Sequence, residues 1–220
     1  MTSDTGTAPA RRAPRPRADA LRNRERIVTA AREMFVEFGA QVPYDEIARR
    51  AGVGNATLYR NFPERDDLVR EVVLSLLARV TELAERAAGE EDDTFAALRR
   101  FVHGAADERV GALCPMLDGG FDKDHSDLVA ERERLEGAVQ GLVDRAQRAG
   151  RLRTDVGVGD LMVAVSQLTR PLPGTACAAF APFVRRHLQL FLDGLETPAR
   201  SELPGTAVTL EDLRRDSCPS

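Results

Sequence analysis

The sequence has no run of about 18 or more apolar residues, the length that reads as a membrane-spanning helix. Residues 1–20 contain arginine but no apolar segment after it, so no secretory signal is expected. Cysteine is scarce: Cys114, Cys177 and Cys218 are far apart and odd in number, which suits a reducing compartment better than a disulfide framework. We therefore expect a cytoplasmic protein that does not associate with a membrane.

The motifs of the common enzyme classes are missing as well. There is no Ser/His/Asp or Cys/His arrangement, no HExxH, no P-loop, and no CxxC or His/Cys spacing typical of structural zinc. Gly52-x-Gly54 and Gly157-x-Gly159 each resemble the start of a dinucleotide-binding fingerprint, but both lie between helical patterns and lack the third glycine. We expect no catalytic residues, no metal and no cofactor, and hence no enzyme.

One segment resembles a calcium-binding loop. Residues 122–133, DKDHSDLVAERE, place oxygen-bearing side chains at loop positions 1, 3, 5 and 12. However, Asp127 occupies the sixth position, where the sharp turn needs glycine. The segment is better interpreted as the start of a helix, capped by Asp124 or Ser126.

The formal net charge of -4 conceals an asymmetry along the chain. Residues 1–65 hold 12 arginines against 8 acidic residues, whereas residues 66–220 hold 19 basic and 27 acidic residues. A basic front on an acidic body is typical of a nucleic-acid-binding head attached to a domain that does not bind nucleic acid, although charge alone carries no sequence specificity.

Apolar residues recur with a helical period along most of the chain and strand-like alternation is scarce, so we expect an all-α fold. One apolar stripe comprises Ile27, Ala30, Ala31, Met34, Phe35 and Phe38. Gly39 is expected to end that helix in a left-handed conformation. Helices are expected over residues 44–51, 55–62 and 65–88, and then over about 94–109, 112–118, 125–149, 157–170 and 175–194.

The stretch GVGNATLYRNF, residues 52–62, contains a turn and the second of two short helices. The two helices are joined by AGVG in the manner of a helix-turn-helix unit. Gly52 permits the turn, and Val53 fills the angle between the helices. The residues expected to hold the second helix down are Leu58 and Phe62, packed on Ile47 and on the Phe35/Phe38 stripe. The remaining side chains are suited to the donors, acceptors and methyl groups of a major groove: they are Asn55, Ala56, Thr57, Tyr59, Arg60 and Asn61.

The segment IARRAGVGNATLYRNFPERDDL resembles the signature of the TetR/AcrR family of transcriptional regulators. The resemblance is strongest over residues 19–70 and mostly architectural over 71–196. It implies base contacts for Asn55, Ala56 and Arg60. It implies phosphate contacts for Thr57, Tyr59, Asn61 and Arg65, with Tyr59 sometimes reaching a base.

Two positions depart from the family pattern, because Pro43 and Gly54 stand where Ser or Thr often caps a helix. Pro43 has no side-chain donor, so Tyr44 is the candidate for the phosphate contact at the start of that helix. Gly54 is an acceptable cap, and Asn55 is the alternative.

The patterns and the resemblance together divide the chain. We expect a disordered basic arm over 1–18, a helix-turn-helix DNA-binding domain over 19–64, a helical ligand-binding and dimerisation domain over 65–196, and a flexible tail over 197–220. The resemblance implies a homodimer, formed through 157–170 and 175–194, that binds a near-palindromic operator in double-stranded DNA, usually as a repressor. The apolar residues available for the dimer contact, some of which must face their own core, are Leu161, Val165, Leu168, Phe180, Phe183, Leu188 and Phe191.

The resemblance also implies a small-molecule effector, largely apolar, bound among the helices of the second domain. Candidate pocket residues, chosen for apolarity or adaptable sulfur with one polar handle, are Leu77, Phe101, His103, Cys114, Met116, Phe121 and Leu142. An ordinary core would use most of the same residues. His103 and Asp107, four residues apart, fit either a polar pair inside a cavity or a pair at the surface.

Three alternatives stay open. The N-terminal arginines serve either as a solubilising tail and helix start or as an arm that reaches an adjacent minor groove; they are Arg11, Arg12, Arg15, Arg17, Arg22, Arg24 and Arg26. The chain is also compatible with a helical small-molecule-binding protein or enzyme whose head resembles a regulator without reading DNA. A dimeric adaptor that has lost DNA recognition is the third, for which Pro43 and Gly54 give slight support.

Overall fold

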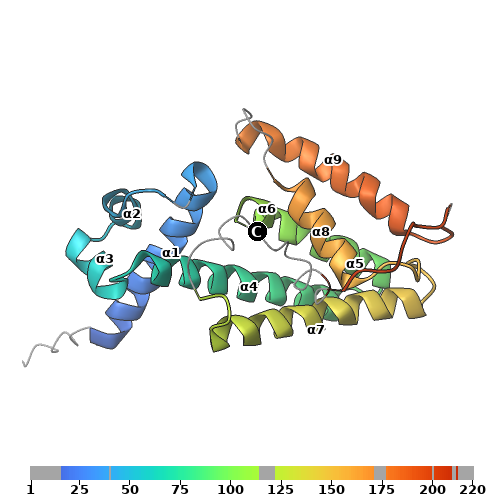
Figure 1. Cartoon of the computed structure of the whole chain (residues 1–220), viewed down its shortest axis with the longest axis horizontal. Coiled ribbons are helices and arrows are strands. Elements are labelled where there is room, and N and C mark those ends of the chain that lie inside the picture. Colours follow the sequence, from blue (N-terminus) through green and yellow to red (C-terminus); the bar gives the residue numbers. More distant parts are fainter. Residues whose placement is uncertain are drawn as a thin grey trace, which may run out of the picture.

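The computed structural model describes residues 16–39, 41–113, 122–170, 177–199, 201–209 and 212. The helices within them are α1 (Pro16–Phe38), α2 (Tyr44–Ala51), α3 (Asn55–Asn61), α4 (Arg65–Glu90), α5 (Thr94–Asp107), α6 (Val110–Leu113), α7 (Ser126–Arg148), α8 (Val158–Leu168) and α9 (Cys177–Leu195). No strand forms in these residues, which confirms the all-α prediction. The first three helices gather at one end of an elongated molecule, the later ones at the other, and α4 runs between them (Figure 1). Within the same residues, no helix is both long and apolar enough to span a bilayer.

The head, α1 to α3, is built around a small apolar core. Phe35 of α1, Ile47 of α2, and Leu58 and Phe62 in and after α3 are each at most 2% exposed, as predicted. Phe38 is 65% exposed, so the prediction that it belongs to the inward stripe is wrong. A helical period identifies which face of a helix is apolar, but it does not show how far the packed neighbouring helices cover that face. Phe38 is the last residue of α1 and lies beyond that cover.

Two glycines with a left-handed backbone end the helices of the head. Gly39 has a φ of 83°, and its N–H donates to the carbonyl of Phe35 over 2.9 Å. Gly52 has a φ of 64°, and the N–H of Val53 donates to the carbonyl of Ala48 over 3.0 Å. These bonds satisfy carbonyls that the helix ends would leave unpaired, and they let the chain turn sharply between α2 and α3.

The body is a helical bundle in which α4 packs against α5 and α7, α6 packs on α8, and α9 lies against α5 and α8. The largest side chains of its core, each at most 1% exposed, are Phe95, Phe101, Leu98, Leu128 and Leu142. Burial of these side chains, together with apolar side chains of α4, α8 and α9, stabilises the body.

Polar side chains set the starts of α5 and α7. Asp93 caps α5, because its Oδ1 accepts from the N–H groups of Phe95 and Ala96 over 2.8 and 3.0 Å. His125 caps α7, because its Nδ1 accepts from the N–H of Asp127 over 3.4 Å. The prediction that Asp124 or Ser126 caps this helix is therefore wrong. The helix begins one residue too late for Asp124, and Ser126 is already its first residue.

The two predicted flexible ends are partly ordered. α1 begins at Pro16, inside the segment expected to be a disordered arm, and residues 1–15 lie outside the described part. At the other end, the N–H of Gly159 donates to the carbonyl of Val208 over 2.8 Å. The carboxylate of Asp160 accepts from the N–H of Val208 over 3.1 Å. Residues 201–209 therefore dock on the start of α8, a contact between positions 48 apart that the tail's own composition could not reveal.

Candidate nucleic-acid interface

α3 is held by one face and exposes the other. Leu58 and the following Phe62 are both 0% exposed, and they anchor the segment on the head core. The other side chains form what we call the α3 outer surface, which consists of Asn55, Ala56, Thr57, Tyr59, Arg60 and Asn61. Thr57 and Asn61 are partly buried and the rest are exposed, with Tyr59 at 54%. All six residues predicted to face a groove thus reach the surface of one short helix.

The polar groups of this surface bond only to their own helix among the described contacts. The Arg60 guanidinium donates from Nε to the carbonyl of Ala56 over 3.0 Å and from Nη2 to the hydroxyl of Thr57 over 3.3 Å. The side-chain amide of Asn61 donates to the carbonyl of Thr57 over 2.7 Å. These local bonds hold the side chains against the helix. None of them involves a side chain of the head core, so the donors can change acceptor without disturbing that core.

The start of α3 is capped by backbone alone. Gly54 is the N-cap residue in an extended conformation, and no side chain accepts a hydrogen bond there. Asn55 is the first residue of the helix, so it does not act as the alternative cap. The side chain of Asn55 is exposed and makes no capping hydrogen bond to the start of α3.

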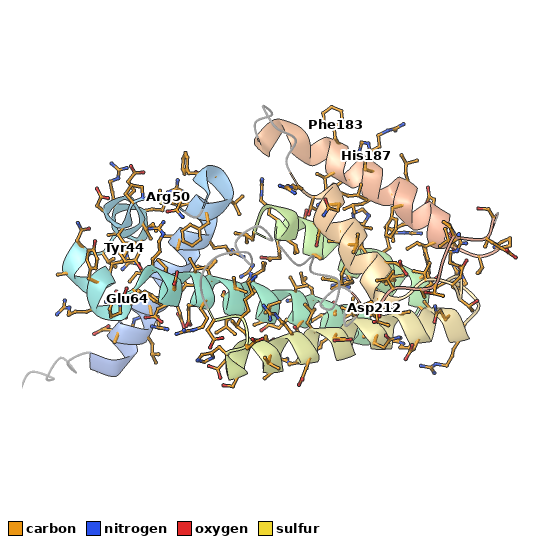
Figure 2. The ribbon with its side chains drawn as sticks, viewed as in Figure 1. Tyr44, Arg50, Glu64, Phe183, His187 and Asp212 are labelled. Carbon is orange, nitrogen blue, oxygen red and sulfur yellow. The ribbon has the colours of Figure 1, made fainter. Side chains whose placement is uncertain are left out.

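Tyr44 is placed differently from the other predicted contacts. It is 9% exposed, and its hydroxyl donates to the carbonyl of Glu64 over 3.0 Å (Figure 2). Burial raises the pKa of the Tyr44 phenol, and the nearby Arg65 charge opposes that rise. Its ring lies 5.2 Å from the Tyr59 ring, tilted by 50°. Tyr44 thus links the start of α2 to the residue before α4 by its hydroxyl, and its ring packs against that of Tyr59.

Arg65 completes the same cluster. Its guanidinium donates from Nη2 to the carbonyl of Val42 over 2.6 Å and lies 5.6 Å from the centre of the Tyr44 ring. The structure therefore brings Tyr44, Tyr59 and Arg65 together. Tyr44 and Arg65 each bond to a backbone carbonyl of another segment, which helps to hold the head together.

Two arginines of α1 contact the helix-turn-helix unit, a role that differs from the solubilising or minor-groove role considered for them from the sequence. Arg24 donates to the carbonyl of Asn61 over 3.3 Å and to the carboxylate of Glu71 over 2.6 Å, and its guanidinium lies 4.4 Å from the centre of the Phe62 ring. Arg26 donates to the carbonyl of Gly52 over 3.0 Å. Arg24 therefore bonds to the end of α3, and the exposed Arg26 bonds to the turn that follows α2. A signal did exist, because Arg24 precedes Ile27 by three residues and so borders the apolar stripe of α1.

Four of the seven candidate pocket residues lie in the described part of the body. Phe101 and Leu142 are 0% and 1% exposed within the body core, and Leu77 is partly buried against it. Cys114, Met116 and Phe121 lie outside the described residues. The pocket therefore stays a prediction.

His103 is the predicted polar handle of that pocket, and it lies between α5 and α9. Its Nδ1 is buried without a hydrogen-bond partner. Burial lowers the pKa of the imidazole, and the charge of Arg185 lowers it further, while a hydrogen bond with Gln189 opposes both. Asp107 does not pair with His103 but with Arg185, through contacts of 2.8 and 2.9 Å.

Within the described residues, no group of three or more His, Cys, Asp or Glu side chains is arranged to hold a metal ion. Of the segment that resembles a calcium-binding loop, residues 126–133 form the first turns of α7.

Comparison with known proteins places both parts of the chain. Residues 27–72 match the model of bacterial regulatory proteins of the tetR family, and residues 91–197 match the C-terminal domain of SbtR-like transcriptional regulators. An HTH-type transcriptional regulator of Staphylococcus aureus is 40% identical over 58 residues, which are 26% of this chain and 31% of that protein. The nucleoid occlusion factor SlmA of Vibrio campbellii is 28% identical over 132 residues, which are 56% of this chain and 62% of that protein. The chain thus spans less than two thirds of the length of these curated relatives.

Solved structures match over a longer stretch. A TetR transcriptional regulator from Streptomyces coelicolor is 30% identical with a TM-score of 0.61, covering 80% of this chain and 99% of its own. A TetR transcription regulatory protein from Mycobacterium vanbaalenii is 30% identical with a TM-score of 0.62, covering 82% and 99%. Together with a helix-turn-helix head whose recognition surface is exposed, these matches show that the chain belongs to the TetR family of DNA-binding transcriptional regulators.

Proposed function

We propose that this regulator is a homodimeric repressor that binds a near-palindromic operator and is released from it by a small, largely apolar molecule. The observation that carries the DNA-binding part is the α3 outer surface: six polar or small side chains project from a helix whose other side is fully buried. Such a helix fits the width of a major groove, which admits one α-helix.

The roles of the outer surface follow from its chemistry. Arg60 is exposed and suited to a bidentate contact with guanine, Asn55 to adenine, and the methyl group of Ala56 to a thymine methyl. Thr57, Tyr59 and Asn61 are assigned to phosphates, which position the helix without specifying sequence.

We further propose that Tyr44 and Arg65 contribute mainly by support. The Tyr44 hydroxyl already donates to the carbonyl of Glu64, and Arg65 already donates to the carbonyl of Val42. A phosphate contact from either residue would have to add to or replace these bonds. Tyr59 is therefore the preferred aromatic contact with DNA.

Dimerisation is proposed through α8 and α9. Phe183 and Leu190 of α9 are 55% and 59% exposed, and they lie seven residues apart, two helical turns along one face. Phe183 points away from the other helices (Figure 2), and Val163 of α8 adds a 41% exposed apolar group. An exposed apolar face of this kind marks a contact surface. The pairing would set two recognition helices about 34–36 Å apart, one turn of DNA.

Part of the apolar set considered for this contact is not available. Leu161, Val165 and Leu188 are 0% exposed in the core of their own chain, and Leu168 and Phe191 are partly buried against it. The side chain of Phe180 is not among those described. The proposed dimer surface therefore rests on Phe183, Leu190 and Val163.

Effector release is proposed to act by a shift between two states. An effector moves that equilibrium only through different affinities for the two states, and about 10⁴-fold is needed to go from 1:99 to 99:1. His103 supports the proposed site in the body, because its buried and unpaired Nδ1 could bond a single polar group of an otherwise apolar molecule.

The test is selection of bound DNA from a random pool with purified protein. We expect a near-palindromic motif whose binding survives about 150 mM salt. Tyr59→Ala and Arg60→Ala should each weaken binding to that motif, whereas Arg148→Ala, an exposed arginine at the end of α7, should not. Weak, sequence-blind binding that disappears with salt would favour the helical ligand-binding protein instead. Unchanged binding by both α3 variants would show that the recognition surface is assigned wrongly.

A further inference from the structure

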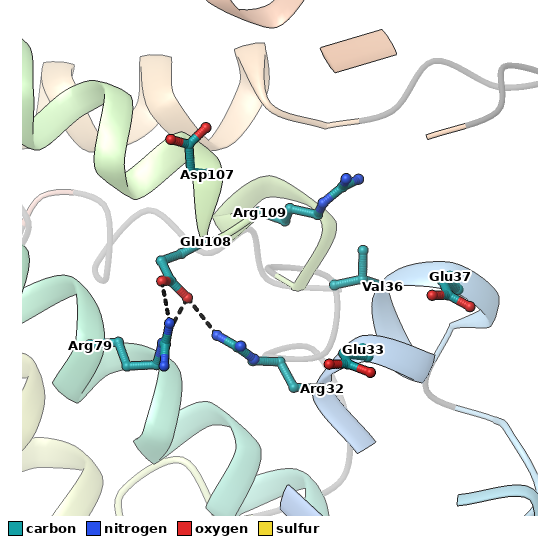
Figure 3. Close-up of a pocket in the computed structure, with 8 residues that line it drawn as sticks. All are labelled: Arg32, Glu33, Val36, Glu37, Arg79, Asp107, Glu108 and Arg109. Atoms are coloured by element: carbon teal, nitrogen blue, oxygen red, sulfur yellow. Dashed lines mark hydrogen bonds and ion pairs between the residues drawn. The ribbon is translucent and has the colours of Figure 1, made fainter. Parts of the chain in front are cut away.

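Glu108, at the end of α5, joins three helices through a single carboxylate. Its two oxygens accept from Nε and Nη2 of Arg79 on α4 over 2.8 and 2.6 Å. One of the same oxygens accepts from Nη1 of Arg32 on α1. Figure 3 shows the carboxylate between the two guanidinium groups. We call this arrangement the Arg32–Glu108–Arg79 clamp.

The clamp crosses a hollow between head and body. The hollow has a volume of about 500 Å³, and Val36 is the one apolar residue among the described residues that line it. The other acidic side chains along it are paired elsewhere: Asp107 with Arg185, and both Glu33 and Glu37 with Arg50. At this place, an ion pair therefore links head and body.

The clamp is partly shielded from solvent. The side chains of Glu108 and Arg32 are 16% and 19% exposed, and that of Arg79 is 49% exposed. Burial by itself raises the pKa of Glu108, but the hydrogen bonds and charges of Arg79 and Arg32 outweigh it and hold the pKa below its ordinary value. Glu108 is thus ionised at neutral pH and bound to both arginines.

A second ion pair also links α1 to α4, and we call each of these two links a tie. Arg24 of α1 bonds directly to Glu71 of α4. Arg32 lies eight residues beyond Arg24, and Arg79 lies eight residues beyond Glu71, so the two ties are about 12 Å apart along each helix. α1 and α4 also pack on each other directly, and two ties at separate points add a restraint on the angle between them that a single tie would not supply.

We propose that Glu108 is a positioning residue for DNA binding: by clamping Arg32 to Arg79, it sets the angle of the head on the body. In a dimer, that angle sets the separation and the orientation of the two recognition helices. The inference rests on the proposed function, since it requires two heads that bind one operator together. It concerns the spacing between half-sites and not the sequence of a half-site, which α3 reads.

The test uses the full-length protein and the operator recovered by selection. Duplexes are made in which the two half-sites are moved apart or together by one and two base pairs, together with a duplex that carries a single half-site. Binding is measured for the native protein, Glu108→Gln, Arg32→Gln and Glu85→Gln. The last is a matched control, because Glu85 accepts from Arg134 over 2.9 to 3.2 Å within the body and does not contact the head.

We expect the native protein and Glu85→Gln to lose at least about tenfold in affinity when the spacing changes by two base pairs. Glu108→Gln and Arg32→Gln should lose at most about threefold over the same change, while all four proteins bind the single half-site equally within about twofold. A fifth protein that carries both Glu108→Gln and Arg32→Gln should behave like Glu108→Gln alone, because both changes break the same link.

Spacing profiles of Glu108→Gln and Arg32→Gln that match the native one would overturn the proposal. A native protein that binds every spacing equally would overturn it too, since there would be no angle to set. If Glu108→Gln does not fold, as judged by circular dichroism, Arg32→Gln decides, because it leaves Glu108 paired with Arg79. Failure of the native protein to bind any selected duplex would instead refute the proposed function.

Discussion

Gly111 lies where α6 crosses α8, and the space that a side chain would need is already occupied. A Cβ built there would lie 2.3 Å from the carbonyl oxygen of Ser166, 2.4 Å from Oγ1 of Thr169 and 2.7 Å from the amide nitrogen of Arg170. Real Cβ atoms essentially never come within 3.0 Å of such atoms. Two of these three neighbours are backbone atoms of the α8 segment, so Gly111→Ala must push the helices apart.

The magnitude follows from two terms. Overpacking a well-packed site costs about 1–3 kcal/mol. Separation of the helices also breaks the buried bond from the N–H of Gly111 to Oγ1 of Thr169, which is 2.9 Å long, and an unpaired buried group costs about 1–3 kcal/mol. The higher helix propensity of alanine returns up to about 1 kcal/mol. We expect a net loss of about 1–6 kcal/mol in the free energy of unfolding.

Gly141 provides a matched control for the same substitution. It lies inside α7 with no atom within 4 Å of the position of a Cβ, so Gly141→Ala should stabilise the protein by about 0.5–1 kcal/mol. Both variants are compared with the parent by urea unfolding followed by circular dichroism, at one fixed chain concentration because dimer stability depends on it. If Gly111→Ala is as stable as the parent, or if both variants shift in the same direction, the reasoning is refuted.

Three further predictions concern the head, the tail contact and the dimer. Leu58→Ala, at a side chain that is 0% exposed, should lower the free energy of unfolding by about 2–5 kcal/mol in the same assay, and a change below 1 kcal/mol would argue against its role as the anchor of α3. The hydrogen bonds from Arg153 lower the pKa of Asp155 from 3.8 to about 2, so its contribution to stability is fully present above pH 3.8 and is lost as the pH falls toward 2. Asp155→Asn should remove that part of the acid dependence in pH-resolved unfolding, and an unchanged profile would contradict the assignment. Phe183→Glu and Leu190→Glu should each raise the dimer dissociation constant by at least about tenfold in analytical ultracentrifugation, whereas native-like dimers would place the interface elsewhere.

The parts of the head that the sequence could predict are those specified by neighbouring residues. α2 begins and ends where Pro43 and Gly52 predict, because proline presets the first φ and glycine permits the left-handed stop. Leu58 and Phe62 are buried as predicted, because their spacing of four places them on one side of a helix.

The rest depends on partners that are distant along the chain. Arg32 and Glu108 are 76 positions apart, and no periodicity links an α1 arginine to the end of α5. Arg24 bonds to the carbonyl of Asn61, an acceptor that every residue carries and that sequence letters therefore cannot distinguish. The prediction that Phe38 is buried is wrong for a related reason. Its position places it on the apolar face of α1, but tertiary packing decides whether another helix covers that turn.

α4 has a consequence for how small a movement can control DNA binding. Its 26 residues form one continuous helix about 39 Å long, with its first turns in the head and its last turns packed on α7. A rotation of about 5° around its far end moves the near end by about 3.4 Å, roughly one base-pair step. In a two-fold dimer the two displacements are opposite, so the separation of the heads changes by up to about two base pairs. A repacking of a few core side chains could therefore change which operators the protein binds, while leaving every residue that touches DNA in place on its own helix.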